Sequence, residues 1–195
     1  YASWQALIDG EARRDAADRA QFIAIVTPNH LHAPVAIAAL EAGLPVLTDK
    51  PLTDTMAAAE AFEAAAARTG GLVGVTHTYA AYPMVRQARA LVASGELGAV
   101  RRVAVRYTQG WLARAEDAVG KQAEWRVDPA RSGLAGAFGD IGTHAFNLVE
   151  TIAGDRMVRL SAELRAAVPG RALDDDGAAM FHLAGGARGT LIASQ

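Results

Sequence analysis

Residues 21–51, QFIAIVTPNHLHAPVAIAALEAGLPVLTDKP, decide the fold of this chain. The stretch contains two short apolar runs, residues 22–26 and 45–48, of the kind that is buried on both faces of a parallel sheet. Between them, Pro34 can occupy the first turn of a helix and Gly43 can end it. The stretch is therefore predicted to form a βαβ crossover.

Each apolar run is followed by a polar loop. The first run leads into Thr27, Pro28 and Asn29, and the second leads into Asp49 and Lys50. In a parallel sheet, ligands bind beyond the carboxyl ends of the strands, which is where both loops fall. The sequence therefore predicts that two polar loops meet at one ligand-binding crevice.

A third motif, GDIGTH, occupies residues 139–144. It opens a predicted helix over residues 140–153, and Asp140 and His144 are four residues apart, hence neighbours on one helix face. At the N-terminus of that helix the dipole favours the negative charge of Asp140. Histidine exchanges a proton readily near neutral pH, so His144 is a candidate general base.

Together these motifs resemble those of the Gfo/Idh/MocA oxidoreductases. Thr27-Pro28-Asn29 with His32 is similar to the TPNxxH loop of that family, residues 49–51 to its (E/D)KP motif, and residues 140–144 to its DxGxH helix. The resemblance implies a nucleotide-binding Rossmann domain joined to a sugar-binding α+β domain. It also implies NAD or NADP as cofactor, a sugar or polyol as substrate, and a homo-oligomer.

The resemblance implies a role for each motif residue. As catalytic residues it implies Lys50, Asp140 and His144. His144 is the base that removes the hydroxyl proton, the ammonium of Lys50 stabilises the developing alkoxide, and the carboxylate of Asp140 orients the substrate. It implies that the cofactor is bound by Thr27, Pro28, Asn29, His32, Asp49 and Lys50. The candidate substrate-binding residues are Lys50, Trp125, Arg126, Asp128, Asp140 and His144.

Each assignment has a simpler alternative. Lys50 can be a solvated loop lysine, and the pairing of Asp140 with His144 can be a capping arrangement. The other polar and aromatic candidates can be loop or packing residues: His30, His77, Tyr79, Trp111 and Trp125. Residues 174–176, DDD, are most simply a solvated turn.

In the rest of the chain, predicted helices and strands alternate at first, and the later part consists mainly of strands and an irregular stretch. Helices are predicted over residues 1–18, from an N-cap at Thr53 to about residue 68, and over residues 83–94. A strand is predicted over residues 72–76. Val103, Val105 and Tyr107 alternate with polar residues, as in an antiparallel strand with one solvated face. An irregular stretch over residues 110–139 and a hairpin formed by residues 178–183 and 189–193 follow.

The predicted fold class is therefore α/β. The C-terminal part of a Rossmann-type parallel sheet, residues 1–80, precedes an α+β domain with a largely antiparallel sheet, residues 81–195. No glycine-rich GxGxxG loop precedes Gln21. We therefore expect the chain to be a fragment that lacks roughly 30 or more residues at its front. Because the residue that distinguishes NAD from NADP lies in that portion of the fold, the choice stays open.

The composition and charge of the chain limit the classes of partner that it is expected to bind. The chain has 195 residues, a net charge of −2 and no cysteine. Interspersed charges do not indicate a nucleic-acid or membrane partner, and the absence of cysteine excludes disulfides and Cys-based metal sites. No metal site is expected, and the expected location is the cytoplasm.

The expected function is hydride transfer between a nicotinamide cofactor and a secondary alcohol of a sugar, inositol or related polyol. Two alternatives stay open: an NAD-dependent glycosidase of the same family, and a non-catalytic nucleotide-binding sensor of the same fold. The fragment alone is expected to bind cofactor poorly.

Overall fold

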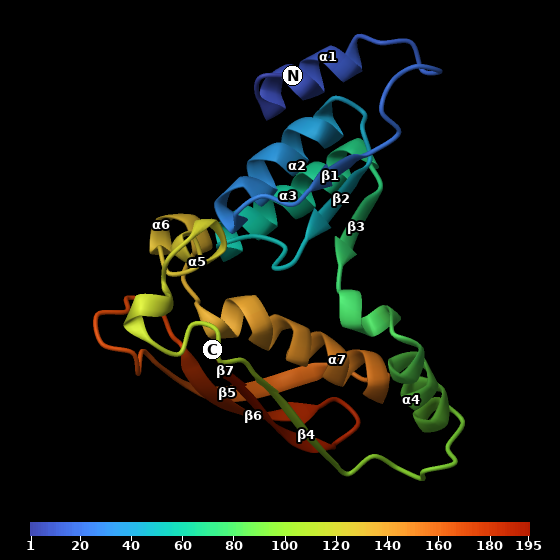
Figure 1. Ribbon diagram of the computed structural model, residues 1–195. Coiled ribbons are helices and arrows are strands. Elements are labelled where there is room, and N and C mark those ends of the chain that lie inside the picture. The colour runs from blue at the N-terminus through green and yellow to red at the C-terminus, as the bar shows by residue number, and fades with distance from the viewer. The chain divides into compact units, whose positions relative to one another are not determined.

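The computed structural model describes residues 1–195, which form two units (Figure 1). The first unit comprises residues 1–76 and 130–133, and the second comprises residues 77–129 and 134–195. Each unit has its own sheet and its own hydrophobic core. None of the helices combines the length and the hydrophobicity that crossing a membrane requires.

The first unit contains the predicted βαβ crossover. Strands β1 (Ile23–Ile25), β2 (Val46–Asp49) and β3 (Val73–Thr76) are parallel and adjacent in the order β1-β2-β3. Helix α2 (His32–Glu41) connects β1 to β2. Helix α3 (Met56–Thr69) connects β2 to β3, so both connections are crossovers of the kind that a parallel sheet needs.

Alanine-rich helices cover one face of this sheet. Helix α1 (Trp4–Ala12) packs on α2, and α2 packs on α3 and on the strands. Ala36 and Ala39 are completely buried, and small side chains at these positions let the helices approach closely. Leu44 and Phe62 fill the core and are almost fully buried.

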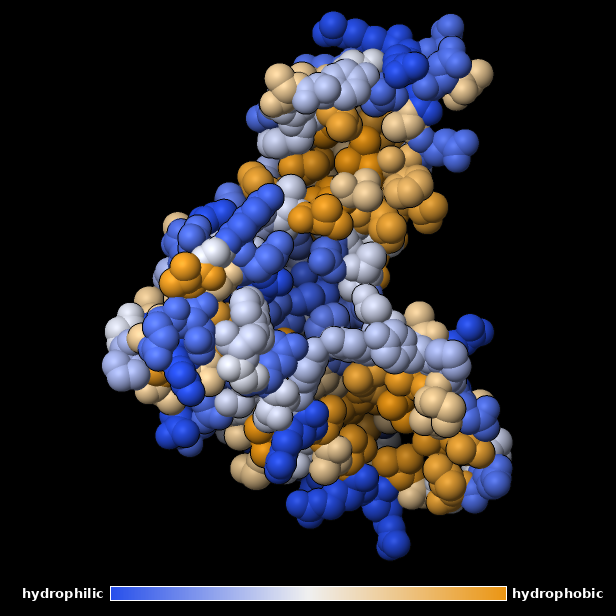
Figure 2. All heavy atoms as spheres, viewed as in Figure 1, coloured by the Kyte–Doolittle hydropathy of each residue, from blue (hydrophilic) through white to orange (hydrophobic).

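The prediction that residues 22–26 are buried on both faces is wrong. Ile23 and Ile25 are buried beneath the helices, but Phe22 is 52% exposed and Val26 is 80% exposed. The reason is that α2 and α3 lie on the same side of β1–β3, so that alternate side chains point away from the core. Figure 2 shows apolar side chains gathered at the surface of this unit.

Two predicted helix starts also differ from the structure. Helix α1 spans Trp4–Ala12 rather than residues 1–18, and the side chain of Ser3 caps it. Helix α3 is capped by Thr55, whose hydroxyl accepts a hydrogen bond from the backbone N–H of Ala58. Thr53, the predicted cap, instead donates its hydroxyl to the carbonyl of Thr55.

The second unit contains a mixed sheet. Its strands are β4 (Arg102–Thr108), β5 (Met157–Arg165), β6 (Asp176–Leu183) and β7 (Arg188–Ser194), in the order β4-β7-β6-β5. The hairpin predicted for residues 178–193 is confirmed, because β6 and β7 are antiparallel. Strand β4 pairs only with β7 and is parallel to it, so the prediction of an antiparallel strand is wrong. Alternating hydrophobicity reports a half-buried strand but not the direction of its partner.

Helices cover one face of this sheet and leave the other open (Figure 1). Helix α7 (Thr143–Ala153) packs on β4 and β7, and α4 (Pro83–Ala93) packs on α7. The core between them includes Phe181, Leu183 and Leu191. We call the uncovered side of β4–β7–β6–β5 the outer face.

The helix predicted over residues 140–153 has two parts. A single π-helical turn, η4 (Phe138–Gly142), precedes α7, so Asp140 lies inside the π turn rather than at an α-helix N-terminus. Such turns occur frequently at functional sites. The stretch over residues 110–139 is not wholly irregular, since it contains η3 (Ala115–Asp117), α5 (Lys121–Glu124) and α6 (Pro129–Ser132).

Candidate functional site

In the first unit, His32 connects the two predicted loops. Its ring is almost fully buried, with Nε2 2.9 Å from the carbonyl oxygen of Thr27 and Nδ1 2.8 Å from that of Pro51. A carbonyl oxygen can only accept a hydrogen bond, so both contacts are hydrogen bonds at once only when both ring nitrogens carry a proton. The side chain thus links the loop after β1 to the loop after β2.

Asp49 is held at the carboxyl end of β2. Its Oδ1 accepts hydrogen bonds from the backbone N–H of Lys50 at 2.8 Å and from the hydroxyl of Thr76 at 2.6 Å. Oδ2 has no hydrogen-bond partner in this unit, so one carboxylate oxygen stays available to a ligand. Lys50 is half-buried in the same loop, and its peptide bond to Pro51 is cis.

A short segment from far along the chain joins this loop cluster. Buried Asn29 donates from Nδ2 to the carbonyl of Ser132 at 2.8 Å, and Nδ1 of His30 lies 3.2 Å from the carbonyl of Arg131. Residues 130–133 belong to the first unit. Asn29 therefore has a structural partner already, as well as its predicted role at the cofactor.

One buried polar atom in the cluster lacks a partner. The hydroxyl oxygen of Thr27 is inaccessible to solvent and makes no hydrogen bond. An unpaired buried hydroxyl is unfavourable, and a polar ligand at the carboxyl end of β1 can offer the missing bond. This atom and the open oxygen of Asp49 fit a nucleotide cofactor, which presents ribose hydroxyl and phosphate groups.

In the second unit, His144 lies in an aromatic cluster. The side chain is 9% exposed, and its ring centroid is 4.6 Å from that of Tyr79, 6.0 Å from that of His77 and 6.2 Å from that of Tyr107. The hydroxyls of Tyr79 and Tyr107 are hydrogen-bonded at 2.6 Å. His144 is therefore a buried residue with fixed neighbours and not a solvated histidine on the helix surface.

Asp140 is the centre of a polar network. Its Oδ2 accepts hydrogen bonds of 3.0 Å from Nε of Arg126 and from the side-chain amide of Gln195. The same amide of Gln195 donates to Gln109 at 3.2 Å, and Gln109 donates to the hydroxyl of Tyr107 at 2.9 Å. The network thus runs from Asp140 to the tyrosine that packs on His144.

Two tryptophans, the substrate-binding candidate Trp125 and also Trp111, lie beside the same arginine. The guanidinium carbon of Arg126 lies 4.3 Å from the ring centroid of Trp125 and 5.5 Å from that of Trp111. Because Arg126 also pairs with Asp140, the structure brings a carboxylate, a cation and two indole rings together. Asp128 is half-buried two residues after Arg126.

The interpretation of residues 174–176 as a solvated turn is wrong. Asp174 accepts hydrogen bonds from the backbone N–H groups of Gly136 and Phe138 at 2.7 and 2.8 Å. Asp175 is buried and accepts from those of Ala167 and Val168. Three acidic residues in a row are typical of a solvated turn, but here backbone N–H groups donate hydrogen bonds to the carboxylates of Asp174 and Asp175. Asp174 thereby fixes the chain where the π turn with Asp140 begins.

Several residues of these clusters had no clear signal in the sequence. Isolated glutamines belong to no motif, so the sequence does not predict a role for Gln109 or Gln195, and it predicts Tyr107 only as a strand residue. A tyrosine at the end of a strand, followed two residues later by a glutamine, was the one local hint. The structure has no group of three His, Cys, Asp or Glu residues that could hold a metal ion.

Family models match nearly the whole chain. Residues 1–77 match the model described as "Oxidoreductase family, NAD-binding Rossmann fold", and residues 85–195 match the model of the GFO/IDH/MocA C-terminal domain.

Two curated proteins, both named as oxidoreductases or dehydrogenases, are similar in sequence to this chain. An uncharacterised oxidoreductase of Bacillus subtilis, YfiI, is 34% identical over 197 residues, which is 100% of this chain and 50% of that protein. A levoglucosan dehydrogenase of Pseudarthrobacter phenanthrenivorans is 32% identical over 154 residues, which is 79% of this chain and 38% of that protein. The chain thus spans about half the length, or less, of the curated relatives it matches.

Solved structures of similar fold and sequence belong to proteins of the same kind. An inositol dehydrogenase homologue from Azotobacter vinelandii, complexed with NAD+, has a TM-score of 0.93 and 36% identity, and the match covers 100% of this chain and 50% of that one. A levoglucosan dehydrogenase in complex with NADH and levoglucosan has a TM-score of 0.87 and 30% identity, and the match covers 100% and 51%. The chain belongs to the Gfo/Idh/MocA family of oxidoreductases.

Proposed function

We propose that this chain belongs to an NAD(P)-dependent dehydrogenase that moves a hydride between nicotinamide and a secondary alcohol of a sugar, inositol or related polyol. The observation that carries the proposal is the Asp140 network, which links a fixed carboxylate to the aromatic cluster around His144. A binding module has no need of a candidate base such as His144. Relatives crystallised with myo-inositol and with levoglucosan support a polyol or sugar as the substrate class.

The first unit has features that suit a nucleotide. The hydroxyl of Thr27 and Oδ2 of Asp49 are unpaired within the unit, and each can pair with a polar group of the cofactor. Pro28, Asn29 and His32 shape the same loop, and the hydrogen bonds of His32 hold it against the loop of Lys50. When bound, the nicotinamide supplies the atom that accepts or donates the hydride.

The residues proposed for catalysis have separate roles. Lys50 binds the reacting hydroxyl, and its positive charge stabilises the alkoxide that forms as the proton leaves. His144 takes that proton on an imidazole nitrogen. Asp140 accepts a hydrogen bond from a neighbouring hydroxyl and orients the ring. Trp125, Arg126 and Asp128 contact the rest of the polyol, since indole faces and charged hydrogen-bonding groups suit such a molecule.

Steady-state kinetics test this proposal. The full-length protein that contains this chain is assayed with a panel of polyols and with NAD and NADP, following the absorbance of the reduced nicotinamide. Lys50→Ala and His144→Ala are each expected to lower kcat at least about 100-fold, the usual loss when general acid–base catalysis is removed. The matched control is His30→Ala, because His30 also lies in the first loop but contacts only a backbone carbonyl there.

Three outcomes are informative. Turnover that survives in both variants contradicts the catalytic roles. Saturable binding of NAD without turnover of any polyol favours the sensor instead. Release of an aglycone from glycosides, with no net reduction of NAD, favours the glycosidase of the same family. We further propose, on the family resemblance, a cytoplasmic homo-oligomer, and the mass in solution measured by light scattering tests its assembly.

A further inference from the structure

A single π turn sets the position of Asp140 in the second unit. The backbone N–H of Thr143 donates to the carbonyl of Phe138, five residues earlier, where an α-helix would use the residue four earlier. Such turns are rare, and they add one residue to the helix. If the turn relaxed to α-helical geometry, the side chains within and before it would rotate about the axis by up to about 100°. The direction of the Asp140 side chain therefore depends on what holds this turn.

Asp174 holds the beginning of the turn. Its Oδ1 accepts a hydrogen bond from the backbone N–H of Gly136 at 2.7 Å, and its Oδ2 accepts one from that of Phe138 at 2.8 Å. Its carbonyl accepts a third from the N–H of Ala137 at 2.8 Å. The first N–H groups of a helix have no partner within it, so a carboxylate is well suited to bind them. The N–H of Asp140 in turn donates to the carbonyl of Gly136 at 2.9 Å.

Two glycines let the π turn lie close to the sheet. An added Cβ would lie 3.3 Å from the Phe138 ring at Gly142 and 2.7 Å from it at Gly177, so the ring contacts both glycines. Gly177 pairs with Ala193 across the β6–β7 ladder, and Ala193 is completely buried. A Cβ on Gly142 would also lie 3.5 Å from that of Ala193. The π turn therefore packs directly on one end of the β6–β7 hairpin.

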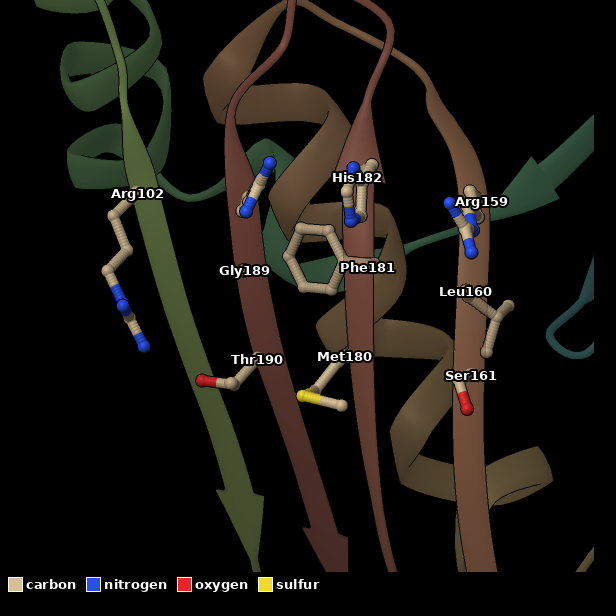
Figure 3. Close-up of a pocket in the computed structure, with 10 residues that line it drawn as sticks. Arg102, Arg159, Leu160, Ser161, Met180, Phe181, His182, Gly189 and Thr190 are labelled. Atoms are coloured by element: carbon tan, nitrogen blue, oxygen red, sulfur yellow. The ribbon is translucent and has the colours of Figure 1, made fainter.

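The same end of the hairpin carries two groups that hold Asp140. Asp174 lies two residues before β6 and Gln195 directly follows β7, and the pairing of the strands brings these ends together. Gln195 donates its side-chain amide to Oδ2 of Asp140 at 3.0 Å. Further along the hairpin, Phe181 of β6 packs against Gly189 of β7, which leaves no room for a Cβ (Figure 3). A well-packed strand pair thus supports both the backbone of the π turn and the carboxylate of Asp140.

We propose that Asp174 is a positioning residue of the dehydrogenase and acts on the substrate only through Asp140. The proposal rests on the function proposed above, in which Asp140 orients the polyol. Both carboxylate oxygens of Asp174 are engaged by backbone N–H groups, which suits a supporting role rather than contact with the substrate. Without this carboxylate the π turn loses its anchor and Asp140 moves. A displacement of about 1 Å is enough to lower a rate about 100-fold.

Steady-state kinetics of the full-length protein that contains this chain test the proposal. Asp174→Asn should lower kcat/KM for the polyol at least about tenfold. The KM for NAD should not change, because the nucleotide loops lie in the other unit. In an Asp140→Asn background the same substitution should cause no further loss, because a residue that acts through Asp140 has nothing left to position.

The matched control is Asp155→Asn. Asp155 is half-buried, as Asp174 is, and it also accepts two backbone N–H groups, those of Arg156 and Gly185 at 2.8 Å each. It follows the other end of α7, so its loss should leave kcat/KM unchanged. Equal losses in the two variants would overturn the proposal, as would losses that multiply in the double variant with Asp140→Asn, since both results mean a general loss of stability.

A second variant is used if Asp174→Asn does not fold. Phe138→Leu loosens the same turn without removing a charge, because it takes away the ring that contacts Gly142 and Gly177. It should lower kcat/KM at least about tenfold and have no further effect in the Asp140→Asn background. An unchanged kcat/KM, or a loss that multiplies in that background, overturns the proposal.

Fluorine NMR gives a readout that needs no turnover. In protein labelled with 5-fluorotryptophan, the resonance of Trp125 reports on Arg126, whose guanidinium carbon lies 4.3 Å from the indole ring and whose Nε pairs with Asp140. Trp125→Phe identifies this resonance. Asp174→Asn should shift it, Asp155→Asn should not, and Asp174→Asn should add no shift in the Asp140→Asn background.

The two readouts separate two kinds of failure. If the unmodified protein turns over no polyol, or if Asp140→Asn is fully active, the proposed function is wrong. The fluorine spectra then decide by themselves whether Asp174 positions Asp140. An unchanged Trp125 resonance in Asp174→Asn overturns the proposal, whatever the activity.

Discussion

His32 hydrogen-bonds through Nδ1 to the carbonyl oxygen of Pro51 at 2.8 Å, across 19 positions of sequence. Its other ring nitrogen contacts the carbonyl of Thr27, so one buried side chain joins the ends of two parallel strands. A histidine that looked like a cofactor ligand in the sequence is thus also a structural link between the two loops.

Replacing His32 with leucine should therefore destabilise the first unit. The contacts of the buried ring with two part-buried carbonyl oxygens are lost, and the expected loss in the free energy of unfolding is roughly 2 kcal/mol or more. Urea denaturation measures it. His30→Leu is the control, because the His30 ring is half-buried and has a single contact of 3.2 Å, so its loss should be smaller. Equal losses would mean that the link is not important.

Asp140→Asn should separate catalysis from cofactor binding. The variant loses the negative charge that holds Arg126, and misplacement of the substrate is expected to lower kcat/KM about 100-fold. The affinity for NAD, measured by fluorescence titration, should not change, because the nucleotide loops lie in the other unit. Asp176→Asn is the control, since Asp176 pairs with an arginine on the sheet's outer face. A similar loss of kcat/KM in the control would show that the effect is not local.

Tyr107→Phe should disconnect the Asp140 network from the aromatic cluster. The variant keeps the ring beside His144 but loses hydrogen bonds to Tyr79 and Gln109, which predicts a destabilisation of about 1 kcal/mol. Chemical denaturation measures this change. Tyr82→Phe is the matched control, because the Tyr82 ring also packs edge-on against Tyr79 but the Tyr82 hydroxyl has no partner. The stability of this variant should therefore equal that of the unmodified protein. Identical stabilities of the two variants would contradict the network.

Gly133→Ala should detach the short segment that joins the nucleotide loops. Gly133 has φ +98°, and an added Cβ would lie 2.5 Å from the carbonyl oxygen of Asp54. Strain and clash together should cost about 2 kcal/mol or more and weaken the hydrogen bond between Asn29 and Ser132. Gly110→Ala is the control, because its surroundings are open. Hydrogen exchange at the loop of residues 27–31 measures the effect, and unchanged exchange would rule it out.

Glu11 should make stability depend on pH. Hydrogen bonds from the hydroxyl of Tyr1 at 2.7 Å and from the backbone N–H of Ala20 at 2.6 Å lower the pKa of Glu11 in the folded state. A carboxyl with a lowered folded pKa stabilises the protein above its unfolded pKa, and this contribution disappears as the pH falls through the folded pKa.

The difference in Tm between the unmodified protein and Glu11→Gln should accordingly be largest near neutral pH and vanish in acid. Glu63→Gln, an exposed glutamate on α3, is the control and should show little difference at any pH. A difference in Tm for Glu11→Gln that does not change with pH would contradict the role of the charge.

The sequence by itself determined the family, the βαβ unit and the hairpin of the second sheet. These features depend on neighbouring residues: apolar runs, helix-stopping glycines, and motifs such as residues 27–32 and 49–51 that stay together along the chain. The four-residue spacing of Asp140 and His144 predicts a shared face of one α-helix, but Asp140 lies in a π turn that precedes the helix.

Only the tertiary structure decided which distant groups meet. Gln195 reaches Asp140 from 55 positions away, and β4 runs parallel to β7 because of the path of the chain between them. The acidic residues Asp174 and Asp175 look solvated in the sequence, yet both accept hydrogen bonds from backbone N–H groups of other segments. Folding brings these polar groups to their hydrogen-bond partners from distant parts of the chain. A local pattern of residues does not predict which distant groups will become those partners.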